Sequence, residues 1–157
     1  MSNIEKNLVR MVAREKIEPG LKNATVGRIS TFTSLEEGVS NAELIVEAAT
    51  ENVELKKAIF RDLDNFAPEG AILATNTSSI SITEIAAATR RAEQVIGMHF
   101  MNPVPIMKLV EIIRGYSTSN EVTERIMKLS ETLEKIPVEV NDYPGFVANR
   151  ILMPMIN

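Results

Sequence analysis

The sequence predicts an α/β fold, in which helices cover a parallel β-sheet. Six short segments have strand-like apolar patterns, and segments with helical spacing separate most of them. Residues 42–48 (AELIVEA) have a continuous apolar centre, which is typical of a strand buried on both faces of a parallel sheet. With 157 residues, of which 45% are hydrophobic, the chain is long enough for one globular domain with a sizeable core.

The predicted strands are residues 27–33, 42–48, 71–75, 93–100, 107–113 and 137–140. The first of them alternates between apolar and polar residues, as a half-buried strand does. An Asn-Pro-x-Pro turn that begins at Asn102 separates the fourth strand from the fifth. The alternation of these strands with helices favours a parallel sheet.

Five helices are predicted from apolar residues at helical spacing. The first begins near the N-terminus and ends at Pro19 and Gly20, and the fifth starts within residues 143–157. Ser81 is the expected N-cap of the third helix, and Thr118 is that of the fourth. The expected inner faces are Leu55, Ile59, Phe60 and Leu63 in the second helix, and Val122, Ile126, Leu129 and Leu133 in the fourth.

The composition narrows the class of protein. The net charge is −4 with acids and bases interspersed, so no basic face indicates a nucleic-acid partner. The chain has no cysteine, which excludes disulfides and thiolate metal sites and suits a reducing compartment. No apolar run approaches membrane-spanning length, and the N-terminus has the pattern of an amphipathic helix rather than a signal peptide. We therefore expect a cytoplasmic protein with no metal, no membrane and no nucleic acid.

Three polar groups fall at the ends of predicted strands, where ligands of parallel α/β sheets bind. They are residues 76–79 (NTSS), residues 99–102 (HFMN) and Glu111. Taken alone, the lone histidine His99 is more often structural, and NTSS before a helix is often simple capping chemistry. Glu111 is harder to dismiss, because a carboxylate within an apolar strand needs a partner. The expected partner is the His99 imidazole on the neighbouring strand.

A histidine–glutamate pair has a definite chemical use. The carboxylate selects the imidazole tautomer and stabilises the imidazolium, so that the other ring nitrogen can take a proton from a substrate hydroxyl. A hydroxyl such as that of Ser78 could hold the substrate oxygen. This arrangement suits the oxidation of an alcohol, in which the hydride leaves to an acceptor.

Four segments carry a family resemblance: LIVEAATEN, LATNTSSISITEIA, GMHFMNPVPIMKLVEII and DYPGFVANRIL. Together they closely resemble the 3-hydroxyacyl-CoA dehydrogenase family, including its 3-hydroxybutyryl-CoA members, from about Ile4 to the end of the chain. The resemblance implies a Rossmann-like α/β sheet and the NAD-dependent oxidation of (S)-3-hydroxyacyl-CoA to 3-oxoacyl-CoA in fatty-acid or butyrate metabolism.

The resemblance also implies roles for single residues. His99 would be the general base and Glu111 its orienting carboxylate, and Ser78 and Asn149 would hydrogen-bond the 3-oxygen or the thioester carbonyl of the acyl-CoA substrate. The positions that match NAD contacts of the family are Ala48, Glu51, Lys56, Asn76, Ser78 and Asn102.

The sequence departs from the family at one motif. The family begins with a strand, a G-x-G-x-x-G turn that binds the pyrophosphate, a helix, and a second strand that ends in a ribose-binding acid. No two glycines of this chain lie two residues apart, so that loop is absent. The resemblance thus predicts a sheet without its first βαβ unit in residues 1–141, a partial NAD-binding domain. Residues 142–157 would be the first helix of an all-helical substrate and dimerisation domain truncated in this chain.

Loss of that unit would leave residues 42–48 with an unpaired apolar edge. The chain would then self-associate, bind a complementing chain, or bring residues 27–33 beside residues 42–48. The alternative function is a non-catalytic fragment or interaction module that is active only when the missing segments are supplied.

Overall fold

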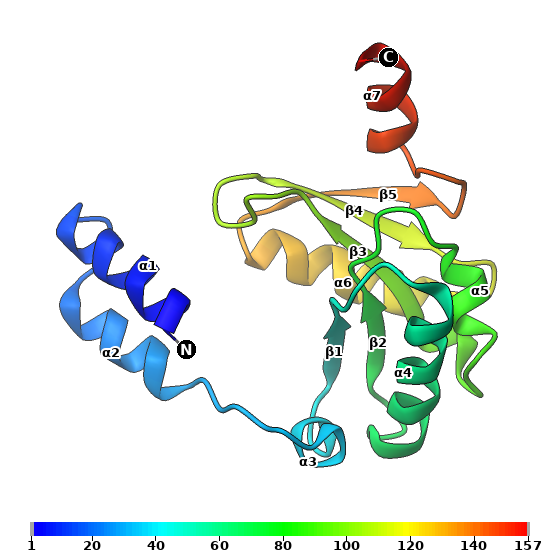
Figure 1. The fold of residues 1–157 in the computed structure, drawn as a ribbon, viewed down its shortest axis with the longest axis horizontal. Coiled ribbons are helices and arrows are strands. Elements are labelled where there is room, and N and C mark those ends of the chain that lie inside the picture. The colour runs from blue at the N-terminus through cyan, green and yellow to red at the C-terminus, as the bar shows by residue number, and fades with distance from the viewer. Residues whose placement is uncertain (1, 157) are drawn as a thin grey trace. The chain divides into compact units, whose positions relative to one another are not determined.

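The computed structural model describes residues 2–156, and the chain divides into two compact units, Met1–Thr33 and Ser34–Asn157 (Figure 1). The first unit contains two helices, α1 (Ser2–Ala13) and α2 (Pro19–Gly27). The prediction that Pro19 and Gly20 end the first helix is wrong, because α1 ends at Ala13 and Pro19 starts α2. Proline is well suited to that first helical position, where its missing N–H has no partner to lose.

The predicted strand at residues 27–33 is also wrong. Gly27 is the last residue of α2, and residues 28–33 form no strand. Alternation between apolar and polar residues is necessary for a half-buried strand, but the strand also needs a neighbour with which to pair. Phe32, one of the apolar residues of this pattern, is 56% exposed. Residues 27–33 therefore contribute no strand.

The second unit contains the other five predicted strands, which form one sheet in the order β1-β2-β3-β4-β5. Their bounds are β1 (Leu44–Glu47), β2 (Ile72–Thr75), β3 (Val95–Phe100), β4 (Leu109–Arg114) and β5 (Ile136–Asn141). The α/β class is confirmed, but the sheet is not wholly parallel, because β3 and β4 are antiparallel. Only eight residues, 101–108, connect them, and a parallel crossover needs a dozen or more. The turn predicted at Asn102 lies within this connection.

Helices cover both faces of the sheet (Figure 1). One face packs against α4 (Val53–Phe66) and α5 (Ile82–Ala86) through a core that includes Phe60, Leu63, Ile82 and Ile85. The opposite face packs against α6 (Asn120–Thr132) through Val122 and Ile126. The remaining helices of this unit are α3 (Leu35–Val39), a 3-10 turn (Ala92–Gln94) and α7 (Ala148–Ile156).

Some helix details differ from the sequence prediction. On α4, Leu55 is 43% exposed whereas Lys56 is completely buried. The N-cap of α6 is Ser119, whose hydroxyl accepts the Val122 N–H, because the Thr118 hydroxyl donates instead to the Val95 carbonyl. Leu133 follows α6 and is 52% exposed. These positions depend on neighbouring elements, so helical spacing alone does not assign them.

Two features of the second unit bear on the site. Gly97 of β3 allows α5 to pack closely, since a Cβ there would lie 2.9 Å from the Ile82 Cδ1. Ser81 caps α5 as predicted, and its hydroxyl accepts the Glu84 N–H. Among residues 2–156, no helix has the length and apolar character needed to cross a membrane.

Candidate active site

His99 and Glu111 are directly opposite each other on the antiparallel strands β3 and β4. The His99 Nδ1 lies 2.8 Å from the Glu111 Oε2, and both residues are buried. The structure thus brings together the two ionisable residues that the sequence places on neighbouring strands. The antiparallel register makes the contact short, because opposite side chains on one face of such a pair lie side by side.

The second ring nitrogen of His99 faces a hydroxyl. The His99 Nε2 lies 3.1 Å from the Ser78 Oγ, and Ser78 is exposed. A carboxylate only accepts hydrogen bonds, so a pair of ionised Glu111 and neutral His99 would carry the ring proton on Nδ1. In that tautomer Nε2 would accept the Ser78 hydroxyl.

The other oxygen of Glu111 is held by backbone amides. The N–H groups of Val147 and Ala148 donate to the Glu111 Oε1 at 3.0 Å and 2.7 Å. The ring of Phe146 stands edge-on to the His99 ring, with 5.9 Å between the ring centroids. The segment between β5 and α7 therefore contacts both members of the buried pair.

Ser78 belongs to a loop that follows β2, residues 76–79, which we call the serine loop. Glu51 holds this loop, because its Oε1 accepts the N–H groups of Ser78 and Ser79 at 3.0 Å and 3.2 Å. The hydroxyls of Thr77 and Ser79 donate to the same oxygen. Burial alone would raise the pKa of Glu51, but the hydrogen bonds from the serine loop and the charge of Lys56 hold that pKa below its usual value.

Lys56 lies beneath this loop in a buried ion pair. Its Nζ is 2.8 Å and 2.9 Å from the two carboxylate oxygens of Glu47, and it donates to the Ala49 carbonyl at 3.2 Å. The Thr75 hydroxyl also donates to Glu47, at 2.7 Å. Three acceptors thus take the three protons of the ammonium, and a further carboxylate oxygen, the Glu51 Oε2, lies 3.7 Å away. Lys56 supports the residues after β1 from inside the protein.

The remaining predicted residues lie at one edge of the sheet, where the parallel strands β1, β2 and β3 end. Ala48 directly follows β1, Asn76 directly follows β2, and Asn102 lies two residues beyond β3. Ala48 and Asn102 are exposed, whereas Asn76 is half-buried and accepts the Phe100 N–H at 2.9 Å. Asn149, in the first turn of α7, donates its side-chain amide to the Ser78 carbonyl at 3.1 Å.

Exposed hydroxyl, amide and backbone groups stand beside an imidazole, so this set of groups can hydrogen-bond a polar ligand. They lie at the carboxyl ends of parallel strands, which is where such sheets bind nucleotides. Among residues 2–156, no group of three or more His, Cys, Asp or Glu side chains could hold a metal ion.

Sequence reasoning missed two contributors to this site, Glu47 and Phe146. Glu47 carries the same signal as Glu111, a carboxylate in an apolar strand, and could have been found by it. Thr77 stands in the NTSS motif that the sequence did single out. Phe146 carries no such signal, because an aromatic residue after a Pro-Gly turn has no preferred partner.

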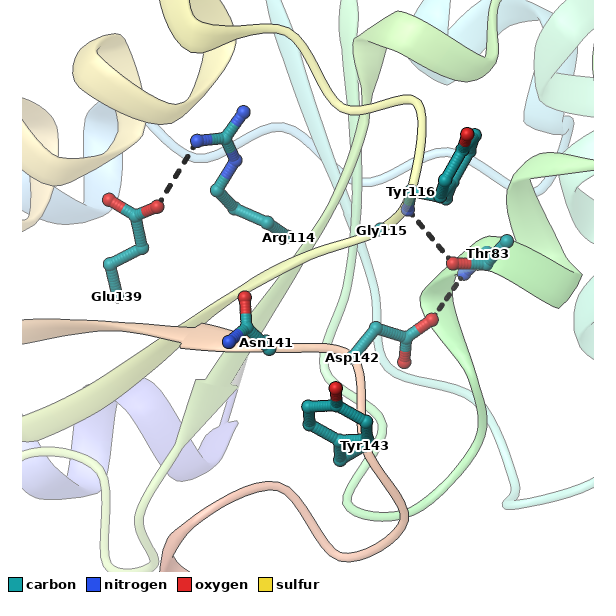
Figure 2. A pocket seen from close by; sticks show the side chains of 8 residues that line it. All are labelled: Thr83, Arg114, Gly115, Tyr116, Glu139, Asn141, Asp142 and Tyr143. Carbon is teal, nitrogen blue, oxygen red and sulfur yellow. Dashed lines mark hydrogen bonds and ion pairs between the residues drawn. The ribbon is translucent and has the colours of Figure 1, made fainter.

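A separate cavity of about 450 Å³ lies where β4 and β5 end, and Figure 2 shows the side chains around it. None of the predicted site residues lines it. The polar groups that Figure 2 joins already contact one another: Tyr116 donates its N–H to Thr83, Thr83 donates its N–H to Asp142, and Arg114 pairs with Glu139. The edge of the sheet that carries His99 is therefore the better candidate for catalysis.

Comparison with known proteins identifies the family of this chain. The model of the 3-hydroxyacyl-CoA dehydrogenase NAD-binding domain matches residues 1–143. The chain is 49% identical over 157 residues to a probable 3-hydroxybutyryl-CoA dehydrogenase of Bacillus subtilis, covering 100% of this chain and 54% of the relative. It is 47% identical over 154 residues to 3-hydroxybutyryl-CoA dehydrogenase of Clostridioides difficile, covering 98% of this chain and 54% of the relative.

The fold agrees as well. The crystal structure of (S)-3-hydroxybutyryl-CoA dehydrogenase PaaH1 from Ralstonia eutropha matches with a TM-score of 0.96 and 46% identity, over 99% of this chain and 55% of that one. The chain thus spans about half the length of these three relatives. It belongs to the 3-hydroxyacyl-CoA dehydrogenase family.

Proposed function

We propose that this chain supplies the catalytic half of an NAD-dependent dehydrogenase that oxidises (S)-3-hydroxyacyl-CoA to 3-oxoacyl-CoA. The observation that carries the proposal is the arrangement of the His99 ring, with Nδ1 on the Glu111 carboxylate and Nε2 facing Ser78 at the sheet edge. Short-chain substrates such as 3-hydroxybutyryl-CoA are the first choice, because two similar relatives carry that name.

In the proposed reaction the His99 Nε2 takes the proton of the substrate's 3-hydroxyl group. Glu111 stabilises the imidazolium that forms, and its hydrogen bond keeps the ring oriented. The Ser78 hydroxyl and the Asn149 amide hydrogen-bond the 3-oxygen or the thioester carbonyl of the acyl-CoA. Bound NAD would accept the hydride from C3 of the substrate.

The cofactor would lie along the edge formed by the ends of β1, β2 and β3. Ala48, Asn76, Ser78 and Asn102 would contact its nicotinamide half directly. Glu51 would act at the same edge, and Lys56 would act through Glu47 and the residues after β1, because its protons are directed at Glu47 and Ala49.

We further propose that residues 1–141 are part of the NAD-binding domain and that residues 142–157 begin a helical substrate and dimerisation domain. Two observations support this boundary. The family's NAD-binding model ends at residue 143, and none of the residues of α7 is buried. A cytoplasmic location remains a prediction.

The open edge of β1 favours a second candidate, in which the chain works only in association with another chain. Within residues 2–156, β1 pairs only with β2, and Val46 of β1 is 41% exposed. A complementing chain that carries the G-x-G-x-x-G segment, or a second copy of this chain, would cover that edge.

The test is the formation of NADH from (S)-3-hydroxybutyryl-CoA and NAD by the purified chain, alone and mixed with a G-x-G-x-x-G segment and the remainder of the helical substrate domain. We expect turnover in at least the complemented sample, and its loss in the His99→Gln variant. Replacement of the exposed Asn3 by Gln is the matched control and should leave turnover unchanged. Normal turnover by folded His99→Gln protein would overturn the proposal.

A further inference from the structure

Both carboxylate oxygens of Glu111 are hydrogen-bonded, and the pair with His99 accounts for only one of them. Its Oε2 faces the imidazole, whereas its Oε1 accepts the two consecutive N–H groups of Val147 and Ala148. We infer that residues 145–148, which we call the carboxylate clamp, are a positioning device that sets the tautomer and orientation of His99. This inference deepens the proposed function and rests on it.

The backbone of the clamp is shaped to direct its amides inward. Gly145 and Phe146 both have positive φ, 75° and 50°. A positive φ is ordinary for glycine but uncommon for phenylalanine, which adopts it only when the surroundings compensate. Here the side chain of Phe146 is buried, and the following two N–H groups reach one carboxylate oxygen. The unusual backbone conformation thus delivers two donors to Glu111.

The clamp is anchored on both sides. Before it, the Asp142 carboxylate accepts the N–H groups of Ile82 and Thr83 at the start of α5, at 3.0 Å and 2.8 Å. After it, the Asn149 side chain donates to the Ser78 carbonyl, and the Arg150 N–H donates to the Gly145 carbonyl at 3.1 Å. These contacts hold the segment between the serine loop and the sheet.

The two hydrogen bonds to Oε1 restrict the rotation of the Glu111 carboxylate. With its Oε1 taken by the clamp, Glu111 cannot rotate without losing two hydrogen bonds, so its Oε2 stays directed at the His99 Nδ1. The Phe146 ring blocks the imidazole on one side, because it stands edge-on to it in a buried contact. The His99 Nε2 is then left unprotonated and directed toward Ser78, as a general base requires.

His99 is the only histidine of the chain, so its ring can be observed without ambiguity. Long-range ¹H–¹⁵N spectra of the uniformly labelled 157-residue chain report which ring nitrogen carries the proton. We expect a single Nδ1–H tautomer in the unmodified chain. An Nε2–H form or an averaged mixture in that chain would overturn the inference.

Two variants test the clamp itself. Ala148→Pro removes one donated hydrogen bond at the first residue of α7, where proline is tolerated, and Ala148→Gly is its matched control because it keeps the amide. Phe146→Leu removes the ring edge, and Phe66→Leu, at an exposed position at the end of α4, is its control. We expect both clamp variants to lose the single Nδ1–H tautomer, and both controls to keep it.

A purely structural role of the clamp gives a different result. In the Glu111→Ala background, which leaves the clamp no side-chain oxygen at this position, Ala148→Pro should produce no further change of the His99 signals if the amide acts through the carboxylate. A change of equal size in both backgrounds, or an unchanged tautomer in both folded clamp variants, would overturn the inference. Amide spectra of each variant establish that it is folded.

A failure of the proposed function can be distinguished from a failure of the carboxylate clamp. In the complemented enzyme, the clamp variants should lower kcat by part of the roughly 10²–10⁴-fold contribution of general-base catalysis, with KM little changed. A single Nδ1–H tautomer in the unmodified chain, together with normal turnover by the His99→Gln variant, would remove the proposed function and leave the clamp as a structural finding. A KM effect without a kcat effect in Ala148→Pro would overturn the clamp alone.

Discussion

His99 and Glu111 face each other in the antiparallel pair of an otherwise parallel sheet, and 2.8 Å separates their side-chain atoms. His99 and Glu111 lie opposite each other because β4 runs antiparallel to β3. Because β4 returns directly from the end of β3, a residue near its start lies beside a residue near the end of β3. The pair therefore stands at the same edge as the serine loop.

The first prediction concerns that pair. In the complemented enzyme, Glu111→Gln should lower kcat by orders of magnitude while KM changes little, because the carboxylate stabilises the imidazolium mainly in the transition state. The amide of glutamine keeps an oxygen for the clamp, so the fold should persist. Steady-state kinetics check this, and an unchanged kcat would contradict the role given to Glu111.

The second prediction concerns the buried ion pair of Lys56 and Glu47. Lys56→Met leaves the Glu47 carboxylate buried without its counter-charge, which costs about 3–5 kcal/mol of the free energy of unfolding. Urea denaturation measures this change. Lys57→Met is the matched control, because the partners of Lys57 are exposed glutamates, and it should change the stability only slightly.

A double variant separates two roles for Lys56. If it acts through Glu47 and the residues after β1, the double variant Glu47→Gln/Lys56→Met should recover part of the lost stability, and NAD affinity should recover with it. Full recovery of stability with no recovery of NAD affinity would instead indicate a direct contact between Lys56 and the cofactor.

The third prediction concerns stability at acid pH. Asp64 of α4 accepts hydrogen bonds from Arg90 and Arg91 at 2.7 Å and 2.9 Å. Burial alone would raise the pKa of Asp64, but the hydrogen bonds from Arg90 and Arg91 and the charge of Arg90 hold it below the ordinary value of 3.8. The unfolded chain therefore binds the proton first as the pH falls. The stabilisation is complete well above pH 3.8 and is lost as the pH falls through 3.8 toward the folded-state pKa.

Asp64→Asn should accordingly lower the free energy of unfolding at neutral pH by about 1.5–3 kcal/mol, the range for hydrogen bonds to charged groups. The difference between Asp64→Asn and the unmodified chain should shrink as the pH falls below 3.8. Denaturation curves at several pH values measure it, with Asp62→Asn at an exposed position of the same helix as control. A difference that stays constant with pH would contradict the argument.

The fourth prediction concerns the edge of β1. Val46 is 41% exposed on this strand, and an apolar unpaired edge is a template for association. We expect the isolated chain to self-associate and to bind NAD weakly at best, because it has no G-x-G-x-x-G turn to hold a pyrophosphate. Light scattering and an NAD titration measure both.

Val46→Lys should reduce the association, since a charge on an edge strand opposes pairing with another chain. Ile4→Lys, an equally large change at an exposed apolar position outside the sheet, is the control and should not reduce it. A chain that stays monomeric at high concentration and binds NAD with micromolar affinity would contradict the prediction.

Much of the second unit could be predicted from the sequence, because its signals are local. The apolar centres of β1 and β2 and the capping pair of Ser81 and Glu84 act over a few residues. The contact of His99 with Glu111 was also predictable, for a different reason. A carboxylate in an apolar strand must find a partner, and the chain has one histidine, on the neighbouring strand.

Other features were decided only by tertiary structure, because they depend on residues distant in the sequence. Residues 27–33 have the alternation of a strand, yet pairing needs a neighbour that the pattern cannot supply. Lys56 is buried and Leu55 exposed because Glu47 lies under the start of α4. Val147 and Ala148 turn their N–H groups toward Glu111 because Phe146 before them is packed into the core that the sheet shares with α5. The sequence by itself determined which residues require burial or a partner, and the packed fold decided which partner each one meets.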